Sequence, residues 1–235
     1  MNYDELYKII RPRLKHERSL EFIATGPKVA GQDRNTGCDI VKRLVGELAK
    51  SGNSSVFGLI DWDGHHEPSD RIIVLGHNRR NGLENVIFDP LLIAALIHRD
   101  GQGELHRIGA STAYVQFLAM ETNRLQEMAS RVAECVLRSK PPRVANYEYL
   151  GGFSLELDER YFTTDDHILE SMILAAFPAL NSVARGRAGK MMHHIITTIL
   201  NDRPEFIPVE VVEAFREILE APAHFDDAQE VAGRM

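Results

Sequence analysis

The sequence predicts an α/β fold: a mostly parallel sheet flanked by helices, followed by a second half that is mainly helical. Three observations predict it. Short apolar runs alternate with segments of helical periodicity through the first hundred residues, and this order builds a parallel sheet. The apolar run 55–61 ends in Asp61-Trp62-Asp63-Gly64, as a strand buried on both faces does. From residue 112 onward, the apolar spacing is that of helices.

The first half alternates between expected strands and helices. Each expected strand is a short apolar run bounded by polar residues. The expected strands are 19–24, 55–61 and 71–75. Apolar residues recur with helical spacing over 38–50, between the first two strands. Asp89-Pro90 then marks a helix start, with Asp as N-cap and Pro at the first helical position. It opens a helix over about 90–98.

The second half is expected to be a series of helices. An apolar stripe predicts one long helix over 112–138, ended by Pro141-Pro142. A capping-box pattern at 163–166 predicts a helix over about 165–177. Two further helices are expected over 189–200 and from Pro208 to about 220, followed by a frayed tail.

The most linker-like stretch is Asp100-Gly101-Gln102-Gly103. It suggests a division into an α/β core over 1–105 and a helical extension over 106–235. We expect the extension to pack on the same core and to contribute Lys190 to the site.

Composition sets broad limits on function. The 235 residues are 44% hydrophobic and 26% charged, with a net charge of −7, so a nucleic-acid partner is not indicated globally. No apolar run reaches the length of a membrane span, and the first residues lack the order of a signal peptide. Cys38 and Cys135 have no ligand-like spacing, which suits a reducing compartment. We therefore expect a cytoplasmic protein without a membrane partner.

Two acidic residues at the end of one expected strand indicate a metal site. Asp61 and Asp63 would emerge at the carboxyl end of the strand 55–61, the edge where open α/β sheets place their chemistry. Carboxylates this close repel each other unless a cation or a proton lies between them. A hard divalent cation such as Mg²⁺ satisfies both.

A wider pattern resembles a known family. A strand ending in Asp61-x-Asp63 after a strand–loop–helix unit resembles a Toprim domain. The segment from Arg79 through Glu84-Asn85 to Asp89-Pro90 is similar to the one that follows this strand in OLD-like and stand-alone Toprim nucleases. Gly189-Lys190 resembles the late Gly-Lys helix of the same group. The resemblance covers about residues 19–220.

The resemblance implies a Mg²⁺-dependent (or Mn²⁺-dependent) nuclease with a defined set of site residues. Asp61, Asp63 and Glu84 would hold the metal. Lys190 would neutralise charge on the scissile phosphate, and Arg79 and Arg80 would hold the nucleic-acid backbone.

The same resemblance marks a departure at Ala24. The family has a catalytic glutamate at the end of its first strand, where this chain has Ala24. Either the chain is naturally degenerate, or the residue replaces a glutamate, or the alignment is shifted. A further acid of the first loop corresponds to Asp33 or to Asp39.

The resemblance also implies partners. OLD-type proteins carry an ATPase on the same chain, but this chain has no Gly-x-x-x-x-Gly-Lys-Ser/Thr loop. It is therefore similar to the toxic effector of a bacterial anti-phage defence system with a separate ABC-type ATPase, as in the PARIS system. Its nucleic-acid substrate would be DNA or tRNA, and a homodimer is plausible.

Two other functions stay open at this point. The chain can be a non-catalytic binding or regulatory protein on a degenerate Toprim scaffold. Alternatively, Asp61, Asp63, His65 and His66 can form the centre of a metallohydrolase, since mixed His/Asp sets bind Zn²⁺, Mn²⁺ or Fe.

Overall fold

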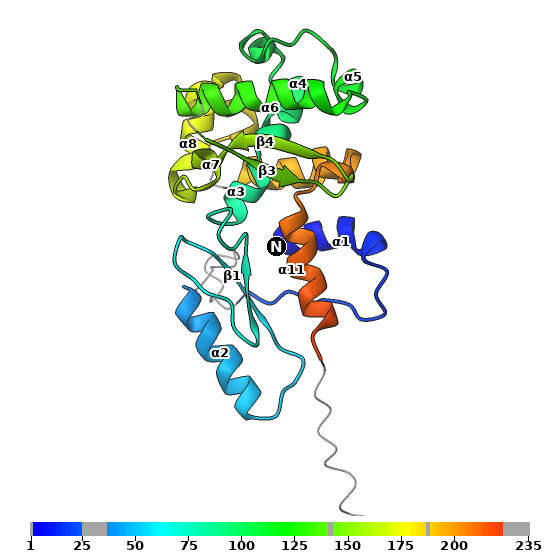
Figure 1. Cartoon of the computed structure of the whole chain (residues 1–235), viewed down its shortest axis with the longest axis vertical. Helices are drawn as coiled ribbons and strands as arrows, with labels where there is room; N and C mark the ends of the chain where they lie inside the picture. Colours follow the sequence, from blue (N-terminus) through cyan, green and yellow to red (C-terminus); the bar gives the residue numbers. More distant parts are fainter. Residues whose placement is uncertain (1, 25–36, 141–142, 187–188, 223–235) are drawn as a thin grey trace, which may run out of the picture.

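A computed structural model describes residues 2–24, 37–140, 143–186 and 189–222. The described chain has a mixed α/β fold with two small sheets (Figure 1). The strands are β1 (Gly58–Asp61), β2 (Ile72–Leu75), β3 (Val144–Glu148) and β4 (Ser154–Asp158).

Helices make up most of the described chain (Figure 1). The α-helices are α1 (Asn2–Leu14), α2 (Cys38–Lys50), α3 (Leu83–Ile87), α4 (Pro90–Asp100), α5 (Tyr114–Leu118), α6 (Thr122–Leu137), α7 (Glu159–Phe162), α8 (Asp166–Ala176), α9 (Asn181–Ala184), α10 (Lys190–His194) and α11 (Val209–Glu220). Shorter helical segments are the 3-10 helices Gln102–Ile108, Pro178–Leu180 and Pro204–Phe206, and the π-helix Ile195–Leu200 that continues α10.

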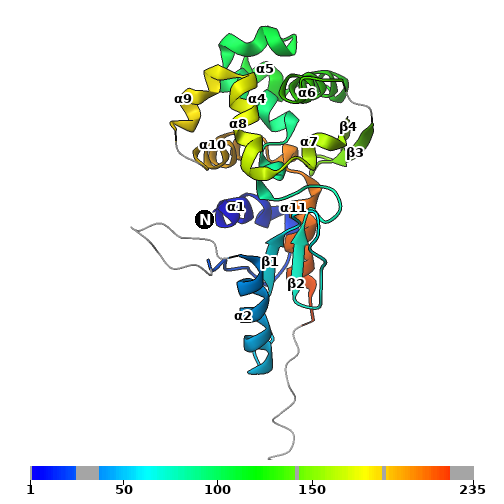
Figure 2. The ribbon, with the colours of Figure 1, turned by 90° about the vertical axis from the view of Figure 1, so that its left-hand side faces the viewer.

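The strands β1 and β2 form a parallel pair that is covered on both faces. Asp61 lies opposite Leu75 in the register, at the carboxyl end of both strands. Because successive side chains of a strand point to opposite faces, Val74 packs with Val45 of α2 while Leu75 joins the main core. In that direction β2 packs against α11, which in turn packs against α1 (Figure 2). The expected parallel orientation of these two strands is confirmed.

The segment 19–24 is not a strand, so that prediction is wrong. It has no strand partner among the described residues. Instead, Phe22 stacks on Tyr3 of α1 with ring centroids 5.8 Å apart, and lies 5.3 Å from the ring of Phe215 of α11. The backbone N–H of Leu20 donates to the hydroxyl of Tyr7 at 3.1 Å. Helix α1, which sequence patterning did not predict, thus provides the surface on which this segment lies.

The expected long helix over 112–138 is two helices. The chain leaves helical geometry between α5 and α6, where Glu121 has an extended backbone as the N-cap of α6. Val115, placed on the apolar stripe from sequence, has 76% of its surface exposed, whereas Leu125 of α6 has 3%. Pro141-Pro142 lie outside the described residues, and α6 ends before them with Arg138 in the left-handed region.

A β-hairpin was missed in the second half. β3 and β4 pair antiparallel across a turn that contains Gly151 and Gly152. Leu155 and Leu157 of β4 are buried at alternate positions, the pattern of a strand with one covered face. The glycine pair between two alternating segments was the available signal.

The helix predictions were otherwise close. α2 has the predicted bounds of 38–50, and α4 begins as predicted, with the Asp89 carboxylate accepting the backbone N–H of Leu91. α8 and α11 match the predicted helices within one or two residues. One large hydrophobic core includes buried residues from α1 through α11, on both sides of residue 105. Within the described ranges, no single helix has both the length and the apolar character needed to cross a membrane. One pair of helical segments, His167–Ala176 and Pro178–Ala184, reaches that length and composition when taken together, but the pair is bent by 116°.

His98 is a buried histidine, and we expect it to make the stability of the fold depend on pH. Its ring is fully buried in α4, with Nδ1 bonded to the carbonyl oxygen of Ala94 at 2.8 Å and Nε2 without a partner among the described residues. Burial lowers the pKa of His98 below its usual 6.5. As the pH falls below 6.5, His98 becomes protonated in the unfolded chain but stays neutral in the folded chain. The free energy of unfolding therefore decreases.

We expect His98→Asn, which keeps a donor for the Ala94 carbonyl, to flatten this dependence. In the wild-type protein, the free energy of unfolding falls by at most about 1.4 kcal/mol per pH unit, the value for one proton. This decrease runs from about pH 6.5 down to the lowered pKa of the folded state. Urea unfolding at a series of pH values measures it. Equal slopes in the two proteins would contradict the assignment.

Candidate functional site

Asp61 and Glu84 lie together at the carboxyl end of β1. Asp61 is the last residue of β1, and its Oδ1 accepts the backbone N–H of Leu83 at 3.0 Å. Leu83 is the first residue of α3 and Glu84 is the second. The Asp61 carboxylate therefore binds the start of the short helix that carries Glu84, and both side chains are half-buried.

Tyr3 of α1 lies beside the Asp61 carboxylate. Burial raises the pKa of the Tyr3 hydroxyl well above its usual value, and the negative charges of Asp61 and Glu84 raise it further. A hydrogen bond joins the hydroxyl to Asp61. Because the Leu83 N–H that Asp61 accepts directly precedes Glu84, the two acids belong to one small region. Sequence reasoning missed Tyr3, since nothing in its spacing indicates a site residue.

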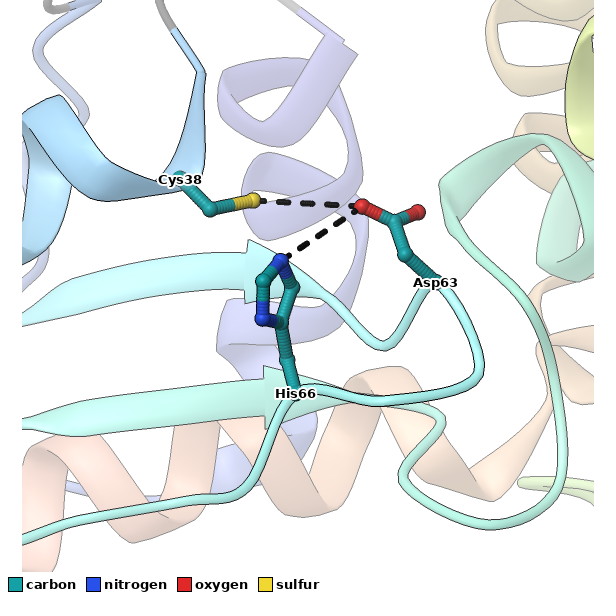
Figure 3. Close-up of side chains that lie close together, drawn as sticks. All are labelled: Cys38, Asp63 and His66. Carbon is teal, nitrogen blue, oxygen red and sulfur yellow. Dashed lines mark hydrogen bonds and ion pairs between the residues drawn. The ribbon is translucent and has the colours of Figure 1, made fainter.

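Asp63 lies beside this region but faces other partners. Its backbone is in the left-handed region (φ of 51°), and its N–H donates to the carbonyl oxygen of Asn81 at 2.9 Å. The carboxylate Oδ2 lies 3.9 Å from Cys38 Sγ and 3.7 Å from His66 Nε2 (Figure 3). Burial raises the pKa of the Cys38 thiol, and the charges of Asp63 and Asp61 raise it further.

The two histidines after Asp63 have different surroundings. Nδ1 of His65 lies 2.6 Å from the carbonyl oxygen of Asp63, and its ring packs against His66 at 4.1 Å between centroids. Nδ1 of His66 lies 3.2 Å from the ammonium of Lys42. Burial lowers the pKa of His66, and the charges of Lys42 and His65 lower it further. A neutral His66 that accepts from Lys42 at Nδ1 carries its proton on Nε2, toward Asp63.

Ala24 ends the described segment that leads to the site. It follows Phe22 by two residues, and Phe22 stacks on Tyr3. The Cα atom of residue 24 therefore lies within about 7 Å of the Cα atom of Phe22, because two residues of extended chain span no more than that. Asp33 lies outside the described residues. Asp39 follows Cys38 in α2, and its charge acts on His66.

Lys190 is exposed at the first position of α10. Two contacts place this end of α10: Gly189 hydrogen-bonds through its backbone to Glu170 of α8, and Met192 Sδ accepts from Asn2 Nδ2 at 2.9 Å. Asn2 directly precedes Tyr3, so α10 contacts the same helix, α1, that carries Tyr3. A contact of Lys190 with substrate stays a prediction.

The predicted phosphate contact of Arg80 is wrong. Its side chain is fully buried, with Nη2 at 2.9 Å from Asp89 Oδ2 and Nε at 3.3 Å from Glu210 Oε1. The guanidinium also lies over the ring of Phe162, 4.2 Å from its centroid. The two buried carboxylates hold this arginine inside the protein, where no phosphate can reach it.

Arg79 is partly exposed, but it is also held. Its Nε lies 3.4 Å from Glu210 Oε1, and its guanidinium donates to the carbonyl oxygen of Asn146 and lies over the ring of Tyr147 at 5.1 Å. Its main contacts thus tie the loop after β2 to β3 and α11. A role in substrate binding for Arg79 stays a prediction.

The donor chemistry at Asp61 and Glu84 fits a hard cation. Both supply carboxylate oxygens, the ligands that Mg²⁺ prefers. The Leu83 N–H and the Tyr3 hydroxyl orient the Asp61 carboxylate, as neighbouring hydrogen bonds orient metal ligands. Asp63 follows Asp61 by two residues, so its negative charge adds to this region.

Comparisons with protein-family models, with curated proteins and with solved structures found no match for this chain.

Proposed function

We propose that the chain is a Mg²⁺-dependent nuclease of the Toprim type. One observation carries the proposal: Asp61, at the carboxyl end of a buried parallel strand, accepts the backbone N–H of Leu83, the residue directly before Glu84 at the start of the following helix. This puts two carboxylates at the sheet edge where α/β proteins bind ligands.

The residues of the site have distinct proposed roles. Asp61 and Glu84 hold the cation, and Tyr3 and the Leu83 N–H fix the orientation of Asp61. When bound, Mg²⁺ would supply positive charge to a phosphodiester oxygen. Asp63 adds negative charge beside the cation. Lys190, at the exposed start of α10, is the proposed contact to the phosphate, since Arg80 is buried and Arg79 is held by Glu210.

The biological context is also part of the proposal. The substrate is a nucleic acid, either DNA or tRNA, and the chain acts as the effector of an antiviral system with a separate ABC-type ATPase. A homodimer in the cytoplasm is the proposed form. These points depend on the resemblance in the sequence.

The test uses the unchanged chain and its Ala24→Glu variant. Both are incubated with plasmid, linear DNA and total tRNA, with and without Mg²⁺. We expect Mg²⁺-dependent cleavage of one substrate class by the variant and little or none by the unchanged chain, because the resemblance implies a catalytic glutamate at position 24.

The outcomes separate two functions. A binding or regulatory protein is the second candidate, and it is favoured by Ala24 at the position of the expected acid. If the variant cleaves no substrate although it stays folded, the nuclease proposal fails and the regulatory one gains support. Cleavage that does not depend on Mg²⁺ would also contradict the proposal.

A further inference from the structure

A second group of possible metal ligands lies beside the acidic region. Cys38 Sγ, Asp63 Oδ2 and His66 Nε2 all lie within 4.8 Å of one another (Figure 3). They come from separate parts of the fold: Cys38 begins α2, Asp63 follows β1, and His66 lies in the loop toward β2. The loop turn at Asp63, fixed by its hydrogen bond to Asn81, aims the carboxylate at the other two.

The distances suit a tetrahedral ion with only a small adjustment. Zinc bonds of about 2.0–2.3 Å put ligand atoms about 3.3–3.5 Å apart. The observed separations from Asp63 Oδ2 are 3.7 Å to His66 Nε2 and 3.9 Å to Cys38 Sγ. All three side chains have access to solvent, so an ion can enter.

The kind of donor separates this group from Asp61 and Glu84. A thiolate and an imidazole favour Zn²⁺ and similar transition metals, whereas Mg²⁺ prefers oxygen ligands. Three protein ligands also leave one tetrahedral position for water. We propose that Cys38, Asp63 and His66 form a Zn²⁺ site that is separate from the Mg²⁺ site, so it does not depend on the nuclease proposal.

Lys42 opposes this binding. Its ammonium lies 3.2 Å from His66 Nδ1, which favours the form of the ring with its proton on Nε2, the atom that must bind the metal. Its positive charge also repels the cation. Removing Lys42 therefore strengthens the site, a result that a purely structural role for the three side chains does not predict.

The experiment measures Zn²⁺ binding by calorimetry and Co²⁺ binding by absorption spectroscopy on the full chain. We expect one Zn²⁺ per chain and, with Co²⁺, a thiolate-to-cobalt charge-transfer band together with tetrahedral ligand-field bands. Cys38→Ser should abolish the charge-transfer band and weaken Zn²⁺ at least about tenfold. Lys42→Met should strengthen Zn²⁺ by about tenfold.

Cys135→Ser is the matched control, because Cys135 is the other half-buried free thiol and lies on α6. It should leave Zn²⁺ affinity and the cobalt spectrum unchanged. His66→Gln gives a second ligand variant, and circular dichroism checks that each variant is folded. A cobalt spectrum without the thiolate band, or Zn²⁺ affinity unchanged in both Cys38→Ser and His66→Gln, would overturn the proposal.

Discussion

Arg80→Met is expected to lower the free energy of unfolding by about 3–5 kcal/mol, because it leaves Asp89 buried without a cation and leaves Glu210 with only the partly exposed Arg79. Arg80 and Asp89 have no exposed surface, and the Arg80 side chain lies within 3.3 Å of both acids. Such a loss is large against the total stability of a domain, about 5–15 kcal/mol. Urea unfolding at neutral pH measures it.

Arg79→Met is the matched control. Arg79 also contacts Glu210, but 44% of its side chain is exposed, so its ion pair contributes only about 0–1 kcal/mol. Arg80→Lys should recover only part of the loss, because an ammonium cannot reach both carboxylates as the planar guanidinium does. A loss for Arg80→Met no larger than that for Arg79→Met would contradict the structural role of Arg80.

Asp61→Asn is expected to reduce cleavage by the Ala24→Glu protein at least about 100-fold. The neutral amide keeps the shape and can still accept the Leu83 N–H, but it loses the negative charge that the proposed cation site requires. The measurement is the initial rate, at saturating Mg²⁺, of cleavage of the substrate that the Ala24→Glu protein cuts. Because one hydrogen bond to α3 is retained, the variant should fold.

Two further variants sharpen this result. Asp63→Asn should reduce the rate less than Asp61→Asn does, since the Asp63 carboxylate faces Cys38 and His66. Asp70→Asn, at a side chain with 97% exposure, should leave the rate unchanged. If Asp63→Asn is the more damaging change, the Asp61 and Glu84 pair is not the centre of the site.

Local signals predicted much of the fold. The capping residues Asp89 and Asp165 gave the starts of α4 and α8, because an N-cap is decided by neighbouring residues alone. The segment 19–24 failed because its apolar residues contact rings of α1 and α11, a tertiary arrangement that a short apolar run cannot distinguish from strand pairing. Helix α1 was missed, although acidic residues at its start and basic ones at its end suit a helix.

The site was predictable where it follows from the strand order. Asp61 was proposed because it ends an expected buried strand, and Glu84 because of a family resemblance. Tyr3 could not be found, since it reaches the site from α1, far away in the sequence. Arg80 was misjudged because charge in a loop indicates solvent contact, and only the fold shows that Asp89 and Glu210 enclose it.

The most direct test of the central claim is Mn²⁺ binding, followed by electron paramagnetic resonance, in the unchanged chain and in Asp61→Asn, Glu84→Gln and Asp70→Asn. Mn²⁺ serves as a probe for Mg²⁺ because both prefer oxygen ligands. We predict one bound Mn²⁺ that Mg²⁺ displaces, weakened at least about tenfold by Asp61→Asn and by Glu84→Gln and unchanged by Asp70→Asn. No bound Mn²⁺, or equal binding in all four proteins, would contradict the account.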